Sequence, residues 1–130
     1  MENKSEARHK ERILFSALDF FKRDFEVNDA EIAKILSVKT EDVQGWFTER
    51  RVDLNDDENL EIRIALLIGI HWNLIAMFSA SENRMAWLRT PHPNMDTNMF
   101  KQRSPLEAIS RPGGLSAVNS YTAFLVGEGA

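Results

Sequence analysis

Residues 85–114 constrain the fold more than any other stretch, because signals that start and stop helices crowd together there. Ser104-Pro105-Leu106-Glu107 is a capping box with proline at the first helical position, which predicts a short helix to about Ser110. Upstream, Thr90-Pro91-His92-Pro93-Asn94 cannot continue a helix, because each proline lacks an amide donor and restricts its neighbour. Pro112-Gly113-Gly114 breaks the chain again. This part of the chain should therefore fold as short helices separated by sharp breaks.

Helical periodicity predicts the remaining elements. A first helix over residues 5–25 should bury a face made of Ile13, Leu14, Ala17, Leu18, Phe21 and Phe25. Further helices are expected at 29–37, capped by Asn28 or Asp29, at 40–49, at 57–78, and at 81–89, capped by Ser81. The last helix should cover 115–126 and leave a small mobile tail at 127–130. The expected fold is all-α, with a helix-turn-helix region at 1–56 followed by a small helical domain at 57–130.

The helix expected at 57–78 is the most apolar segment of the chain. Ile64 to Ile70 is an unbroken apolar run, but Arg63, His71 and Asn73 interrupt the segment before it reaches the ~20 residues that a membrane span needs. A helix that is apolar nearly all round is expected in the core or in a dimer interface. We interpret His71 and Asn73 as satisfied core or rim polar groups, and we expect no membrane partner.

The charge balance weighs against a strongly nucleic-acid-binding chain. The net charge is −4, and residues 1–56 carry 10 Lys/Arg against 13 Asp/Glu. Nonspecific DNA affinity comes from neutralising phosphates, so such chains are usually basic. The chain has no cysteine, which excludes disulfides and thiolate metal sites and is compatible with a cytoplasmic location.

The spacing in residues 29–50 predicts a helix-turn-helix corner. Ala33 occupies the small position where two helices touch, and Ser37-Val38 forms the turn. Val43 and Trp46 should pack the second helix back on the first. Ser37 occupies the position at which such turns usually have glycine, the residue that adopts their backbone conformation without steric strain.

The exposed positions of that second helix are the candidate DNA contacts. Gln44 and Thr40 could read base edges, and Lys39 could hold a phosphate. Glu41 and Asp42 would face the phosphates unfavourably, unless one of them reads a cytosine amino group. The alternative is a helix pair that only packs or dimerises.

Signals of an enzyme are weak. The sequence contains no nucleophile elbow, zinc-protease motif or phosphate loop. The three histidines are isolated in sequence, and the acids around Asp57 suit the solvated start of a helix better than a metal site. We expect no catalytic residues, no metal and no cofactor.

In combination, several motifs resemble the Xre/MbcA/ParS family of antitoxins. The C-terminal resemblance covers about residues 58–130, and the N-terminal one about 29–50. The matching features are Trp87-Leu88, the loop with Pro91, Pro93 and Asn94, Ser104-Pro105-Leu106, Gly113-Gly114, Val118 and a terminal helix ending near Gly127.

The resemblance implies a bifunctional antitoxin of a type II toxin–antitoxin pair. Such proteins bind a RES-domain toxin that consumes NAD, with the antitoxin C-terminus plugging the toxin's active site. They also tend to form homodimers and to repress their own operon by binding operator DNA. The implied toxin contacts are Trp87, Pro91, Pro93, Asn94, Gly127, Glu128, Gly129 and Ala130. Trp87 could equally be a core residue.

An alternative reading is a stand-alone helix-turn-helix transcriptional regulator without a toxin partner. It predicts sequence-specific DNA binding that falls steeply with salt. A small hydrolase would need a convergent acid–base pair, which these residues do not supply.

Overall fold

The computed structural model describes residues 4–92 and 103–129, and every regular element in those residues is a helix. The helices are α1 (Lys4–Phe25), α2 (Asp29–Leu36), α3 (Thr40–Glu49), α4 (Glu58–Met77), α5 (Ser81–Arg89), α6 (Pro105–Ile109) and α7 (Gly114–Gly129). The all-α prediction is confirmed, and the helix bounds lie close to those expected from the sequence.

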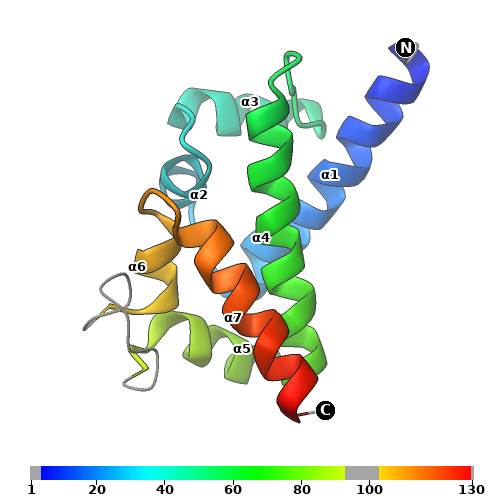
Figure 1. The fold of residues 1–130 in the computed structure, drawn as a ribbon. Coiled ribbons are helices and arrows are strands. Elements are labelled where there is room, and N and C mark those ends of the chain that lie inside the picture. Colours follow the sequence, from blue (N-terminus) through cyan, green and yellow to red (C-terminus); the bar gives the residue numbers. More distant parts are fainter. Residues whose placement is uncertain (1–3, 93–102, 130) are drawn as a thin grey trace.

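Helix α4 lies at the centre of the molecule, with the other helices around it (Figure 1). It packs against α1, α2, α5 and α7, and α7 runs along most of its length. Helices α2 and α3 lie beside the N-terminal half of α4, whereas α5 lies near its C-terminal end. The first turns of α1 project away from the bundle. Both predicted regions therefore meet on one helix.

The buried residues of α4 account for part of its apolar composition. Leu60, Ile64, Leu67, Ile70 and Leu74 are at most 4% exposed and belong to the hydrophobic core. By length and composition alone, α4 would also suit a membrane span, but the central helix of a helical bundle meets the same criteria. Its packing on four other helices supports the core interpretation.

One hydrophobic core joins the two predicted regions. It contains Phe21 and Trp46 from the first region and Leu67, Ile109 and Val118 from the second. The boundary at residue 56 stays a prediction about sequence organisation.

Three local expectations were wrong. Ile13 is 56% exposed, and Phe15, which was not assigned to the inner face of α1, is buried in its place because α3 covers that side. The N-cap of α5 is Ala80, whose side chain offers no cap, so Ser81 is the first helical residue. Helix α7 continues through Gly129, three residues beyond its expected end.

The predicted glycine break before α7 has a steric cause. Gly113 adopts a positive φ of 79°, which L side chains rarely adopt. A Cβ on Gly114 would lie 1.7 Å from the carbonyl oxygen of Ala108. The two glycines therefore let α7 start directly against the end of α6.

Candidate functional site

The α2–α3 corner has the local geometry that its sequence predicts. Asn28 caps α2 through a capping box in which its side chain accepts the Glu31 N–H at 2.8 Å. Ser37 ends α2 in the left-handed conformation, with φ 59°. Ala33, Val43 and Trp46 are buried between the helices. A tight two-helix corner is therefore present.

The candidate DNA contacts gather in the first turns of α3. Lys39, Glu41, Asp42 and Gln44 are exposed, and Thr40 is half-buried. One Asp42 carboxylate oxygen accepts the Lys39 backbone N–H at 3.2 Å, so Asp42 acts as a helix cap. The five residues share one helix end, but two of them are acids.

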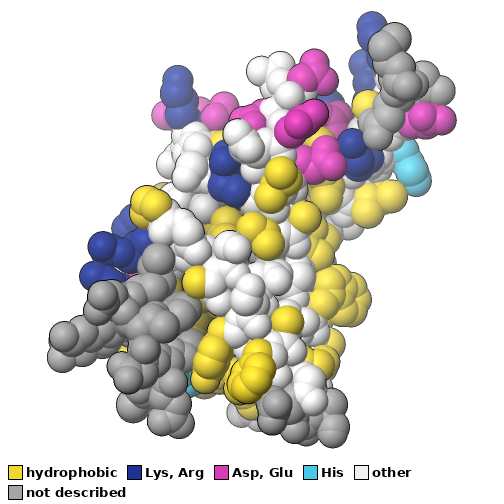
Figure 2. Space-filling model, in the orientation of Figure 1, with side chains coloured by type: hydrophobic (Ala, Val, Ile, Leu, Met, Phe, Trp, Pro, Cys, Tyr) yellow, Lys and Arg dark blue, Asp and Glu magenta, His cyan; other side chains and the backbone are white. Residues whose placement is uncertain are grey.

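More acids lie along α3, from its first turn to its last. A groove of about 390 Å³ between α3 and the segment leading to α4 is lined by Glu41, Asp42, Glu49, Asp53 and Asp57, with Arg51 among them. Figure 2 shows acidic side chains over the end of the molecule where α3 and this segment lie. The negative potential there would repel the DNA backbone.

Trp87 on α5 is half-buried and packs against the edge of the core. The His92 ring stacks on it with centroids 4.7 Å apart, and His92 Nε2 donates to the Trp87 carbonyl oxygen at 2.7 Å. The stack folds the chain back after α5 and keeps Pro91 exposed. Pro93 and Asn94 lie outside the described residues.

The end of α7 forms a second candidate contact surface. Asn73 Nδ2 donates to Thr122 Oγ1 at 3.0 Å, and Asn119 Nδ2 donates to the Leu66 carbonyl at 3.0 Å, so α4 holds the middle of α7. Beyond these bonds Phe124 is 60% exposed and Gly127 is exposed. The expectation of a mobile tail is corrected through Gly129, which is helical, whereas Ala130 lies outside the described residues.

A buried ionic cluster, which the sequence did not reveal, joins α1, α4 and α5. Arg84 Nε and NH2 donate to the two oxygens of Asp24 at 2.8 and 3.0 Å, and His71 Nε2 donates to Asp24 at 2.7 Å. Phe20, Phe21 and Phe25 surround the His71 ring, with centroids 4.5 to 5.8 Å away. The expectation that His71 is a satisfied core group is met.

The surroundings shift the pKa values of this cluster. Burial lowers the pKa of His71 despite its bond to Asp24, so the ring is neutral at pH 7. Burial alone would raise the pKa of Asp24, but hydrogen bonds from Arg84 and His71 outweigh it and lower that pKa. The hydrogen bond to Asp24 raises the pKa of Arg84. The cluster therefore contains one ion pair held by a neutral imidazole.

Arginines of α5 also bond to backbone carbonyls just after α4 and at the C-terminal end of α1. Arg84 NH1 donates to the carbonyls of Phe78 and Ser79, while Arg89 NH2 donates to the Phe25 carbonyl at 2.9 Å. An acid such as Asp24 in the last turn of a helix opposes the helix dipole. That placement was the one sequence signal that could have indicated a buried cationic partner.

The described residues hold no group of three or more His, Cys, Asp or Glu placed to bind a metal. Among these residues, every buried side-chain nitrogen and oxygen has a hydrogen-bond partner.

Comparison with protein families gives a match in the C-terminal part of the chain. Residues 73–121 match the model of the antitoxin Xre/MbcA/ParS C-terminal toxin-binding domain. The match begins in the second half of α4 and ends in α7 beside Thr122. No curated protein matches the chain. This stretch is therefore similar to the toxin-binding domain of that antitoxin family, and such a domain implies a toxin partner.

Proposed function

We propose that this protein is an antitoxin that binds a RES-domain toxin that consumes NAD and neutralises it by covering the toxin's active site with the end of α7. The observation that carries the proposal is the toxin-binding-domain match, which stops just before the exposed end of α7. Helix α4 anchors α7 as far as Thr122, so the last turns can enter a partner without disturbing the core.

The chemistry of that end suits a plug. Phe124 offers a large exposed apolar side chain, and Gly127 adds no side chain that could obstruct a narrow site. A helix that is already ordered loses little conformational entropy when it binds. We propose Trp87, Pro91, Pro93 and Asn94 as a second contact region, and Gly127, Glu128, Gly129 and Ala130 as the inserted segment.

Co-expression with the product of the neighbouring gene tests this proposal. Growth, intracellular NAD and co-purification are measured for the full chain and for a chain ending at Val126. We expect the full chain to restore growth and NAD, and the shortened chain to lose this protection. Ser120→Ala, an exposed change on the same helix, is the matched control and should protect fully. A shortened chain that protects as well as the full chain would overturn the plug.

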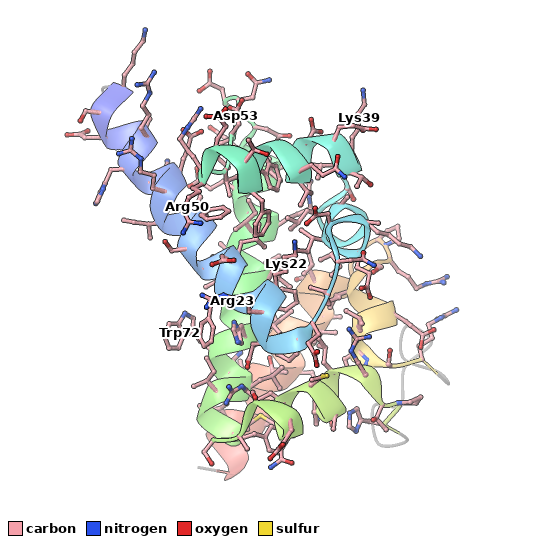
Figure 3. The ribbon with its side chains drawn as sticks, turned by 180° about the vertical axis from the view of Figure 1, so that it is seen from behind. Lys22, Arg23, Lys39, Arg50, Asp53 and Trp72 are labelled. Atoms are coloured by element: carbon pink, nitrogen blue, oxygen red, sulfur yellow. The ribbon has the colours of Figure 1, made fainter. Side chains whose placement is uncertain are left out.

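We also propose a homodimer, supported by apolar surface on α1 and α4. Ile13, Phe20 and Trp72 are 56%, 38% and 60% exposed, and Phe20 contacts His71, the neighbour of Trp72. Figure 3 shows Trp72 pointing away from the bundle. Light scattering should give twice the chain mass for the wild type and the chain mass for Trp72→Glu. A wild-type monomer would contradict the dimer.

Operator binding through the α2–α3 corner is the second proposed role, and a stand-alone regulator is the alternative function. The left-handed turn at Ser37 and the buried Ala33 support the corner. A regulator without a toxin would bind DNA but would neither co-purify with the neighbouring gene product nor restore growth.

A further inference from the structure

We propose that duplex DNA is bound by a row of cations on α1 and at the end of α3, and that the acidic first turns of α3 do not contact it. We call this row the basic ridge and define it as Arg8, Arg12, Lys22, Arg23 and Arg50. The inference deepens the proposed operator-binding role and is independent of the toxin.

Helix geometry places the α1 members of the ridge on one face. Positions 8, 12, 15, 19, 22 and 23 follow three- and four-residue steps, so their side chains lie in one band along the helix. Arg8 and Arg23 are about 22 Å apart along the axis, at 1.5 Å per residue. Each DNA strand carries one phosphate per ~3.4 Å of helix axis, so the band could reach several phosphates.

Helix α3 adds Arg50 to the middle of this band. Arg50 ends α3 in the left-handed conformation, with φ 56°, and its guanidinium carbon lies 5.4 Å from the Phe15 ring centroid. Figure 3 shows Arg50, Lys22 and Arg23 at successive levels along α1, whereas Lys39 lies at the far end of α3. Arg50 and Lys39 therefore lie at opposite ends of α3.

An aromatic platform fixes two of these cations in place. Phe15 and Phe47 pack edge to face with centroids 4.9 Å apart, and Lys22 Nζ lies 4.3 Å from the Phe47 centroid. Cation–π contacts place Lys22 over the Phe47 ring and Arg50 over the Phe15 ring. A cation held in place before binding loses less entropy when it meets a phosphate.

Two carboxylates near the ridge are engaged in ion pairs. Asp19 pairs with Arg23 at 3.2 Å, and Asp29 pairs with Lys22 at 2.6 Å. Arg8, Arg12 and Arg50 are exposed, and the described residues give them no carboxylate partner. Three cations are thus free to meet phosphates, although the whole chain is acidic.

Duplex DNA suits this surface better than an anionic membrane does. Binding to a bilayer surface would be favoured by exposed apolar side chains within the same band. Here Phe15 is buried and Phe47 is half-buried beneath the cations, so the band itself presents charge. Arginines dominate the ridge, and guanidinium groups bind phosphates in bidentate fashion.

Fluorescence anisotropy of the full chain with a labelled 25-bp duplex tests the ridge between 50 and 200 mM NaCl. Three to five phosphate contacts predict a slope of log K against log salt of about −3 to −4.5. The double variant Arg12→Gln/Arg50→Gln should reduce the slope by roughly 2 and weaken binding at 50 mM about tenfold or more. Circular dichroism checks that each variant remains folded.

Two single variants separate the ridge from its competitors. Arg111→Gln removes an exposed charge near α6 and should leave binding unchanged, as should Lys39→Gln at the start of α3. Loss of binding in Lys39→Gln, with the double variant unaffected, would overturn the ridge but keep operator binding. Absence of binding to any duplex would overturn both, and binding only to phosphatidylserine vesicles would replace DNA with a membrane.

Discussion

Arg84 on α5 donates to both carboxylate oxygens of Asp24 on α1, at 2.8 and 3.0 Å, with both side chains at most 9% exposed. The pair connects a helix outside the toxin-binding-domain match to one inside it. Breaking a buried ion pair by removing one charge leaves the other unpaired, which costs more than the pair itself contributes. The pair therefore joins α1 directly to α5 in the core.

Asp24→Asn should lower the free energy of unfolding by about 3–5 kcal/mol, because it leaves Arg84 charged and buried without its partner. Urea unfolding followed by circular dichroism measures the change. Asp19→Asn on the same helix is the control. Its ion pair with Arg23, whose side chain is 71% exposed, should contribute at most about 1 kcal/mol. Equal losses of unfolding free energy in the two variants would show that the buried cluster contributes no more to stability than the exposed ion pair.

The free energy of unfolding should decrease in two steps as the pH is lowered. The pKa of His71 is lowered from 6.5 in the folded protein, so below that pH the unfolded chain takes up a proton that the folded chain does not. The free energy of unfolding should then decrease by up to about 1.4 kcal/mol per pH unit from this group. Asp24, whose pKa is lowered from 3.8, should add a second loss as the pH falls through that region.

Urea unfolding at several pH values between 7 and 3 measures both steps. His71→Gln should remove the first step, because glutamine does not titrate, and leave the second. His9→Gln, at an exposed position, should keep the first step. A wild-type stability that is constant from pH 7 to pH 5 would refute the role of His71.

Gly114→Ala should destabilise the protein by several kcal/mol, or prevent folding, because the new Cβ would meet the Ala108 carbonyl. Gly45→Ala is the matched change on α3, where a Cβ meets nothing within 4 Å. It should stabilise the protein by about 1 kcal/mol through helix propensity alone. Thermal unfolding of both variants measures the contrast, and a neutral Gly114→Ala would contradict the close approach of α6 and α7.

Ser37→Gly should raise the free energy of unfolding by roughly 0.5–1 kcal/mol, because serine pays a steric cost at φ 59° that glycine avoids. Ser120→Gly, at an exposed position inside α7, should lower it by about 0.5 kcal/mol through lost helix propensity. Chemical denaturation of the two variants should therefore show shifts of opposite sign. Shifts of the same sign would argue against the left-handed turn.

Local signals in the sequence determined most helix starts and stops. The capping box at Ser104, in which the Glu107 N–H bonds to the serine hydroxyl at 3.2 Å, needs only residues three apart. The corner at Ser37 likewise follows from neighbouring residues. The predicted end of α7 lay too early in the chain. Glycine at 127 and 129 weakens a helix but does not prevent it from continuing.

Only the tertiary structure decided which charged residues meet. Asp24 finds His71 and Arg84 47 and 60 positions away, and no local period encodes such a distance. The same packing seats Arg50 over Phe15 and buries Phe15 in place of Ile13. Sequence periodicity fixes a helix and its average polarity, because hydrogen bonds within a helix are local. The surface that a helix buries depends on which distant helix removes its side chains from water.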